Sequence, residues 1–237
     1  MKQAAIIGSS GAIGGAFVRQ LSARPDFERV FAFSRAGAEP AGAGVVTASL
    51  DLTDESSVAA AAEQAGELDL VIVASGLLHT PDFGPEKALR DLAAEKFATV
   101  FAANTIGPAL GMKHFLPKLP RDRPSIFAAL SARVGSISDN RMGGWYAYRA
   151  SKAALNMLIK TASVEVARKN KQAAIVGLHP GTVDSNLSEP FKKGVKPEKL
   201  FTGDYSAERM LAVVAGLTAE HTGQCFAYDG EEIEPEG

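Results

Sequence analysis

Short apolar runs alternate with amphipathic stretches along this chain. The runs at residues 2–7, 30–33, 45–50, 70–74, 125–130, 173–178 and 224–228 have the length and residue types of strands. Apolar residues recur at helical spacing in residues 16–21, 55–65, 89–115, 145–169 and 207–217. Thr53 or Asp54 can cap the helix expected at 55–65. The pattern therefore predicts strand and helix in turn from end to end.

This alternation predicts an α/β fold built on a parallel sheet. The run at 70–74 is apolar throughout, as expected of a strand whose two faces are both covered by helices. Right-handed crossovers between such strands give a single-domain, Rossmann-type doubly wound sheet of about seven strands with helices on both faces. No internal repeat or low-complexity linker divides the chain, so we expect one domain over residues 1–237, with a flexible substrate lid at about 184–203.

Composition narrows the class of protein. With 46% apolar and 22% charged residues, the 237-residue chain has ordinary globular composition, and a formal charge of -2 argues against nucleic acid or a membrane surface as partner. The one cysteine, Cys225, excludes an internal disulfide, and we expect it to be buried near the last strand. The four histidines lack metal-ligand spacing, so no metal site is expected. Without a signal-type leader or a run of 18 apolar residues, the expected location is cytoplasmic.

A glycine-rich turn follows the first expected strand. Its sequence is Gly8-Ser-Ser-Gly11-Ala-Ile-Gly14, and a helical pattern begins directly after it. Glycines allow the backbone to turn tightly and approach a pyrophosphate, while the new helix presents unpaired N–H groups and its positive dipole end to the anion. An ordinary strand-to-helix turn is the alternative, but strand, glycine turn and helix in this order at the start of an α/β chain favour a phosphate cradle.

Tyr148 and Lys152 lie four residues apart, so they project from one face of the helix expected at 145–169. A neighbouring ammonium favours the phenolate, and we therefore expect the pKa of Tyr148 to lie below its ordinary value. Such a phenol is a usable general acid or base. Tyr146 is six residues from Lys152 and lies off that face.

Several motifs occur together in one order. They are the glycine turn, Asn104-Thr-Ile-Gly107, a serine after the strand at 125–130, Tyr148 followed four residues later by Lys152, and His179-Pro-Gly-Thr-Val-Asp-Ser185. In this order and spacing the chain resembles the short-chain dehydrogenase/reductase family over nearly its whole length. The strings Leu130-Ser-Ala-Arg-Val-Gly-Ser-Ile137 and Gly143-Gly-Trp-Tyr-Ala-Tyr-Arg-Ala-Ser-Lys152 are similar to the C-factor and sniffer-type carbonyl reductase branch.

The resemblance implies a role for each member of the set. Tyr148 would exchange a proton with the substrate oxygen while the nicotinamide exchanges a hydride with the carbon. Lys152 would hold the nicotinamide ribose and keep Tyr148 acidic. Asn104 would orient a water in the proton relay, although it could instead satisfy a helix kink near Pro108. A serine would donate a hydrogen bond to the substrate oxygen as charge develops there.

The identity of that serine stays open in the sequence. Counting from the start of the strand at 125–130 selects Ser131, whereas counting back from Gly135 selects Ala132. The two counts differ by one residue, which on a strand reverses the face. Ser131 is the candidate catalytic residue, and Ser136 is the alternative donor.

Cofactor preference follows from the end of the second strand. An NAD enzyme usually places a carboxylate there to bind the ribose 2'-hydroxyl, but here the residues are Ser34 and Arg35, which favour a 2'-phosphate. NADP (NADPH) is therefore expected rather than NAD. By resemblance the cofactor contacts are Gly8, Ser10, Gly11, Ile13, Gly14, Ser34, Arg35, Asp51, Leu52, Ala74, Ser75, Gly76, Asn104, Tyr148, Lys152, Pro180, Gly181, Val183 and Ser185. Asp51 is an alternative cap for the following helix.

The expected partner is a small-molecule carbonyl or alcohol substrate. Leu78, Val134, Trp145 and Leu187 follow the relevant strands and are candidates for the substrate pocket. A dinucleotide-binding sensor that keeps the fold with little turnover is the alternative function. Family habit implies a homodimer or homotetramer formed through the helices at 89–115 and 145–169, although relatives near the carbonyl reductases include monomers.

Overall fold

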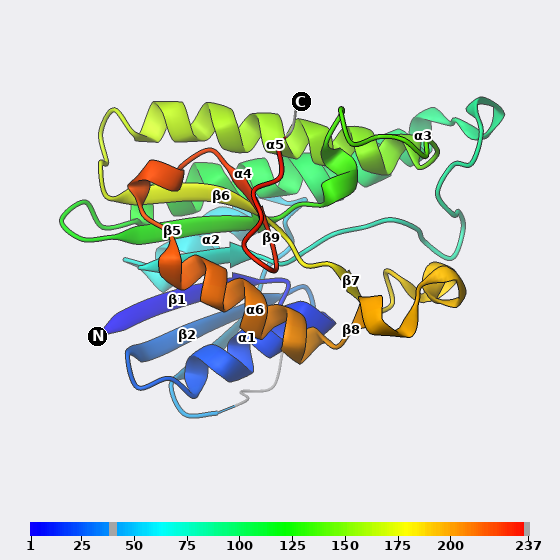
Figure 1. The fold of residues 1–237 in the computed structure, drawn as a ribbon. Helices are drawn as coiled ribbons and strands as arrows, with labels where there is room; N and C mark the ends of the chain where they lie inside the picture. The colour runs from blue at the N-terminus through cyan, green and yellow to red at the C-terminus, as the bar shows by residue number, and fades with distance from the viewer. Residues whose placement is uncertain (38–41, 235–237) are drawn as a thin grey trace.

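Seven parallel strands form the central sheet of this protein, whose computed structural model describes residues 1–37 and 42–234. Their order is β3-β2-β1-β4-β5-β6-β9 (Figure 1). The strands are β1 (Lys2–Ile7), β2 (Phe27–Ser34), β3 (Val45–Ser49), β4 (Leu70–Val73), β5 (Ser125–Leu130), β6 (Ala173–His179) and β9 (Cys225–Ala227). The predicted doubly wound sheet is confirmed.

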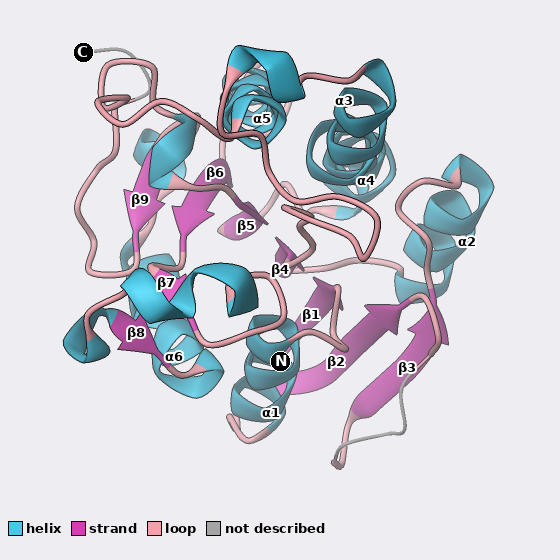
Figure 2. Ribbon diagram, turned by 90° about the vertical axis from the view of Figure 1, so that its right-hand side faces the viewer, coloured by secondary structure: helices cyan, strands magenta, loops and turns pink. Residues whose placement is uncertain are grey.

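Alternate residues of each strand enter two hydrophobic layers, as the pleat requires. In β1, Ala5 and Ile7 join the layer beneath α2 (Glu55–Ala65), α4 (Gly107–Phe115) and α5 (Tyr146–Val166). Ala4 and Ile6 join the layer beneath α1 (Ala12–Ser22) and α6 (Gly203–Gly216). Figure 2 shows the two groups of helices on opposite sides of the sheet. Helices on both faces explain why β4 is apolar at every position.

The prediction of one helical stretch over residues 89–115 is wrong. The chain instead makes a 3-10 turn (Leu89–Asp91), α3 (Ala94–Phe101), a π-helical turn (Ala102–Ile106) and α4. Pro108 lacks an N–H and so cannot complete the regular hydrogen-bond ladder of an uninterrupted helix. A Cβ on Gly107 would lie 2.9 Å from the Cβ of Leu52, so the π-helical turn ends where α4 packs closely on the loop after β3.

Asp54 is the cap of α2, which decides between the alternatives in the sequence. Its carboxylate accepts hydrogen bonds from the backbone N–H groups of Ser56 at 2.9 Å and Ser57 at 3.4 Å. Asp51 accepts instead from the N–H and hydroxyl of Thr53, at 2.9 and 2.7 Å. Neither Thr53 nor Asp51 caps the helix, and Asp51 stabilises the loop that precedes it.

A small second sheet, not expected from the sequence, lies within and beside the predicted lid. Strands β7 (Thr182–Val183) and β8 (Leu200–Phe201) pair in parallel and close a segment that contains two 3-10 turns, Glu189–Gly194 and Pro197–Lys199. Two-residue strands carry too little pattern to be recognised. No helix in the described part of the chain is long and apolar enough to cross a membrane.

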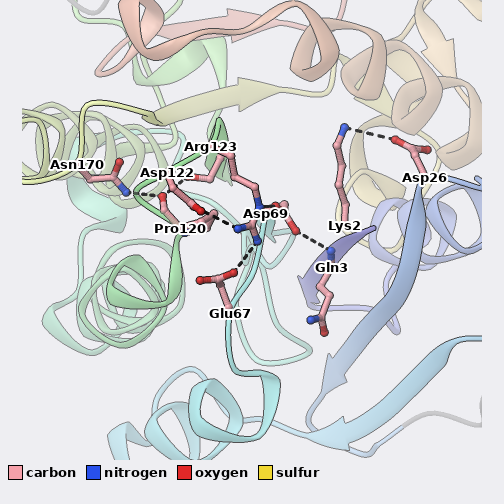
Figure 3. A network of polar contacts seen from close by, with 10 residues as sticks. Lys2, Gln3, Asp26, Glu67, Asp69, Pro120, Asp122, Arg123 and Asn170 are labelled. Carbon is pink, nitrogen blue, oxygen red and sulfur yellow. Dashed lines mark hydrogen bonds and ion pairs between the residues drawn. The ribbon is translucent and has the colours of Figure 1, made fainter.

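Polar contacts join loops and strands at the amino-terminal edge of the sheet (Figure 3). Asp69, which precedes β4 and is 7% exposed, accepts hydrogen bonds from the backbone N–H of Gln3 at 2.8 Å and from Nε of Arg123 at 2.7 Å. Arg123 also donates to Glu67 at 2.6 Å. The hydrogen bonds that Arg123 donates to the two carboxylates raise the pKa of its guanidinium. This network ties β1, β4 and the loop before β5 together at the edge opposite the predicted site.

Candidate active site

The glycine turn after β1 has the tight backbone geometry that its sequence predicts. Gly8 has a φ of 92°, in the left-handed region, and Gly11 donates its N–H to the carbonyl of Gly8 at 3.1 Å. A Cβ on Gly14 would lie only 2.1 Å from that carbonyl oxygen, so no larger residue fits. No side chain caps α1, which leaves the N–H groups of its first turn free to bind an anion. Ser10 is exposed and Ile13 half-buried in this same segment.

A cavity of about 400 Å³ lies beside this turn. It opens between the first turns of α1 and α6, where a Cβ on Gly203 would lie 2.6 Å from the carbonyl oxygen of Ala12. Its lining residues are Ser9, Ser10, Gly11, Ala12, Gly15, Arg19, Gly203 and Asp204. Arg19 and Asp204 form an ion pair of 2.6 Å across its rim.

Three buried hydroxyl groups test whether a dinucleotide fits along this edge. Among the described residues, Ser9, Ser34 and Ser75 have buried hydroxyl oxygens without a hydrogen-bond partner. They follow or end β1, β2 and β4, which are neighbours in the sheet. Buried polar groups are usually hydrogen-bonded, so a row of unpartnered hydroxyls along the carboxyl edge fits a polar ligand such as a dinucleotide. Ser9 was not among the predicted contacts, although it stands directly beside Gly8.

The end of β2 carries the expected charge. Arg35 is exposed directly after the strand, and Asp51 lies half-buried nearby. The hydroxyl and N–H of Thr53 hold the pKa of the Asp51 carboxyl below its ordinary value, and the positive charge of Arg35 contributes. Leu52 packs under the bend at Gly107 and belongs to the core as well as to this edge.

The exit of β4 brings the glycine turn and the predicted catalytic residues together. A Cβ on Gly8 would lie 3.0 Å from the carbonyl carbon of Ala74, so the two turns are in contact. A Cβ on Gly76 would lie 3.7 Å from Oδ1 of Asn104 and 3.8 Å from Nζ of Lys152. The side chains of Asn104 and Lys152 therefore converge on Gly76.

Asn104 is fully buried in the π-helical turn. Its Oδ1 accepts from the N–H of Leu77 at 2.7 Å, and its Nδ2 donates to the carbonyl of Leu77 at 2.8 Å and to the hydroxyl of Ser151 at 3.1 Å. These bonds join the loop after β4 to α5 and do not satisfy the bent helix itself. The π-helical turn displaces Asn104 from a regular helical position and lets it reach both neighbours.

Tyr148 and Lys152 are buried on one face of α5, as predicted, with Nζ of Lys152 5.8 Å from the centre of the Tyr148 ring. The expected fall in the pKa of Tyr148 is wrong for this structure. Desolvation raises the pKa of Tyr148 to about 12 and lowers that of Lys152 to about 8. Lys152 donates to the carbonyl of Leu130 at 2.7 Å, so burial dominates both groups and the tyrosine is a neutral phenol.

The two candidate serines have other partners. The hydroxyl of Ser131 donates to Oδ1 of Asn156 at 2.6 Å, one turn beyond Lys152 on α5. The hydroxyl of Ser136 donates to the carbonyl of Glu234 at 2.8 Å. Ala132 lies between them, half-buried. Ser131 therefore lies beside the helix of the tyrosine, but its hydroxyl donates to Asn156 and not to the phenol.

The turn after β6 is built around Gly181. Its φ is 73°, and a Cβ there would lie 2.7 Å from the ring of Phe201. Pro180 accepts a hydrogen bond from Ser206 at 2.7 Å, Val183 is buried in β7, and the hydroxyl of Ser185 donates to the carbonyl of Val183 at 3.3 Å. The predicted contacts of this segment thus lie together at the carboxyl end of β6.

Aromatic side chains cover the tyrosine. The ring of Trp145 lies 6.2 Å from that of Tyr148 and 4.7 Å from that of Phe191, in the predicted lid. His79 lies 6.5 Å from Phe191, and its Nε2 forms a 2.9 Å hydrogen bond with the carbonyl of Asn186. Phe191 and His79 were missed in the sequence because only folding brings their two loops together.

The other residues predicted to line the substrate pocket differ in their burial and neighbours. Leu187 lies near Gly76, 3.6 Å from a Cβ placed there. Leu78 is buried and Val134 half-buried, each after its expected strand.

Two further groups are buried and neutral. Desolvation lowers the pKa of His179 to about 4, and burial raises the pKa of the Cys225 thiol to about 11. The thiol lies in β9, as predicted, and donates to Asn156 at 3.4 Å. In residues 1–37 and 42–234 no three His, Cys, Asp or Glu side chains are arranged to hold a metal ion.

Comparisons with known proteins found a matching family model and similar sequences and structures. A family model described as short chain dehydrogenase matches residues 2–196. The C-signal protein of Myxococcus xanthus is 35% identical over 146 residues, which cover 62% of this chain and 82% of that protein. The structure of NADPH-bound carbonyl reductase from chicken fatty liver has a TM-score of 0.82 at 26% identity and covers 98% of both chains. Carbonyl reductase Sniffer of D. melanogaster shares the fold, with a TM-score of 0.82 at 20% identity over 98% of this chain and 99% of that one.

Proposed function

Because this chain belongs to the short-chain dehydrogenase family of NAD(P)-dependent oxidoreductases, we propose that it transfers a hydride between NADP and a carbonyl or alcohol substrate. The observation that carries the proposal is the pairing of buried Tyr148 and Lys152 beside the row of unpartnered serine hydroxyls. A general acid and a dinucleotide-sized polar edge are the two parts that this reaction needs.

Tyr148 has the protonation state that carbonyl reduction requires. Its pKa of about 12 keeps the phenol neutral at neutral pH, ready to give a proton to the substrate oxygen. With a pKa of about 8, Lys152 remains largely an ammonium at neutral pH, and its positive charge favours the phenolate left behind. We propose Asn104 as the group that supports a proton relay next to Lys152. Bound NADPH would supply the hydride.

Cofactor preference rests on the end of β2 and on the glycine turn. The first turn of α1 would hold the pyrophosphate, while Arg35 and the buried hydroxyl of Ser34 would hold the 2'-phosphate of NADP. The carbonyl reductase from chicken fatty liver, named above as a structural relative, is bound to NADPH. We expect NADPH to be preferred over NADH.

The segment at 184–203 is proposed as the substrate lid. Phe191 lies on Trp145, whose ring contacts that of Tyr148, and the carbonyl of Asn186 is hydrogen-bonded to His79, so the segment already packs over the wall beside the tyrosine. Such a cover would exclude water during hydride transfer. A serine that donates to the substrate oxygen, with Ser131 as first candidate and Ser136 as second, stays a prediction, as do the cytoplasmic location and a homodimeric or homotetrameric state.

A sensor with little turnover is the second candidate function. It is favoured by one observation, that the hydroxyls of Ser131 and Ser136 are bound to Asn156 and Glu234. The reaction would use a serine hydroxyl to stabilise the developing negative charge on the substrate oxygen, and in this structure both candidate hydroxyls donate to other groups.

Turnover of NADPH with a panel of aldehydes, ketones and quinones separates the two functions. Tyr148→Phe removes only the phenolic hydroxyl, and we expect kcat/KM to fall about 10²- to 10⁴-fold with NADPH binding retained. Tyr146→Phe is the matched control, since it makes the same change two residues earlier, away from Lys152. NADPH binding without turnover by the unmutated protein on the whole panel would favour the sensor. Full activity in Tyr148→Phe would refute the assigned role of the tyrosine.

A further inference from the structure

Three successive residues in the left-handed region precede α5. Gly143, Gly144 and Trp145 have φ angles of 65°, 67° and 53°, and Trp145 is the only residue other than glycine with a positive φ in the described part of the chain. A bulky residue stays in this region only where its surroundings fix it there. Trp145 is also the N-cap of α5, and its own side chain does not cap the helix. Contacts from elsewhere must therefore hold the turn.

Glu86 provides those contacts from the loop after β4. Its backbone carbonyl accepts from the N–H of Trp145 at 2.6 Å, and its carboxylate accepts from the N–H of Ala147 at 3.2 Å. Although it lies in a loop, Glu86 is only 3% exposed. One residue thus satisfies two N–H groups at the start of α5 that the helix itself leaves unpaired. A negative carboxylate is also favoured at this positive end of the helix dipole.

Arg149 holds the same turn from its other side. Its Nε donates to the carbonyl of Gly144 at 3.0 Å, and a second guanidinium nitrogen donates to the carbonyl of Val134 at 3.3 Å. The turn is therefore clamped between the loop after β4 and the loop after β5. Both loops leave the carboxyl edge of the sheet beside the site.

The clamped turn fixes the positions of two side chains of the site, those of Trp145 and Tyr148. It directs the Trp145 ring against the rings of Tyr148 and Phe191, and Tyr148 follows Ala147 directly in the first turn of α5. A displaced first turn would move both the proton donor and the aromatic wall over it. Displacements of about 1 Å at reacting groups are enough to cost about 10²-fold in rate.

We propose that Glu86 is a positioning residue, which fixes the first turn of α5 and so holds Trp145 as the wall of the substrate site and Tyr148 in place to donate its proton. The proposal rests on the function proposed above for Tyr148. Glu86 acts through the backbone of α5, by accepting hydrogen bonds, and does not touch the substrate. A glutamine, whose amide oxygen accepts in the same place, should therefore replace it.

The test uses the fact that Trp145 is the sole tryptophan of the chain. In cofactor-free full-length protein, Glu86→Ala should shift the tryptophan emission to longer wavelength and increase its quenching by acrylamide. In the same variant kcat should fall about 10- to 100-fold while the Kd for NADPH, measured by its fluorescence, stays unchanged. Glu86→Gln should restore both the emission and most of kcat. Glu95→Ala, an exposed glutamate in α3, is the control and should match the unmutated protein.

Two results would overturn the proposal. One is that Glu86→Ala leaves both the tryptophan emission and kcat unchanged. The other is that Glu86→Gln is as impaired as Glu86→Ala. If Glu86→Ala does not fold, Glu86→Asp withdraws the acceptor by one methylene while keeping the charge, and the same emission shift and loss of kcat are expected. The emission does not depend on turnover, so an inactive unmutated protein would refute the proposed function while the fluorescence arm still decides whether Glu86 holds Trp145.

Discussion

Replacing Lys152 by methionine tests the desolvation of the site quantitatively. The ammonium is 2% exposed and burial lowers its pKa from an ordinary 10.5 to about 8. The unfolded chain therefore binds more protons than the folded one between pH 8 and 10.5. This difference costs the folded protein roughly 3 kcal/mol at neutral pH, and the cost fades as pH rises toward 10.5.

Lys152→Met removes this cost but adds another. It leaves the carbonyl of Leu130 without its 2.7 Å hydrogen bond, which costs about 1–3 kcal/mol at every pH. At pH 7 the two effects nearly cancel, so stability at a single pH decides nothing. The pH dependence is decisive: relative to the variant, the unmutated protein should gain roughly 2 to 3 kcal/mol between pH 7 and pH 10.

The measurement is urea unfolding of both cofactor-free proteins at several pH values from 7 to 10, followed by circular dichroism. Lys160→Met, on the exposed side of α5, is the matched control and should show a difference that does not change with pH. A flat difference for Lys152→Met would refute the reasoning, because it would mean that the buried ammonium is solvated or paired in the folded protein.

Three further changes test the cradle, the cofactor preference and the edge network. Gly14→Ala places a Cβ 2.1 Å from a carbonyl oxygen and should abolish NADPH fluorescence enhancement, whereas Gly216→Ala, with nothing within 4 Å, should leave it intact. Arg35→Ala should raise the KM for NADPH roughly 10- to 100-fold and leave that for NADH nearly unchanged, and an equal change for both would contradict a 2'-phosphate contact. Asp69→Ala leaves the backbone N–H of Gln3 without its acceptor, while Arg123 keeps Glu67 as a partner, so thermal unfolding should report a loss of roughly 1 to 3 kcal/mol; a loss too small to measure would show that the buried carboxylate adds no stability.

The folded chain confirms those predictions that rest on local pattern. The apolar run at 70–74 became the buried strand β4, and Gly8, Gly11 and Gly14 form the expected turn at α1. Residues spaced four apart on a helix share a face, so the pairing of Tyr148 with Lys152 also followed from spacing alone. Each of these features depends on residues within one turn or one strand of each other.

Predictions that depended on distant neighbours were less successful. The helix at 89–115 is interrupted because α4 packs on Leu52, and the pKa of Tyr148 rises because the surrounding elements bury it. The hydroxyl of Ser131 is bound to Asn156, a partner 25 positions away. Glu86 gave no signal at all, since its role requires the loop after β4 to meet the start of α5.

The sequence by itself determined the doubly wound sheet, the glycine turn at the start of α1 and the pairing of tyrosine with lysine. Periodicity, glycine geometry and helical spacing are local properties, so they can be read from residues that are close together in the chain. Only the tertiary structure decided which groups are desolvated, which serines are occupied, and what holds Trp145 in its left-handed conformation. Burial and hydrogen bonding between segments arise when the sheet brings its loops to one edge, and the protonation of the site follows from that assembly.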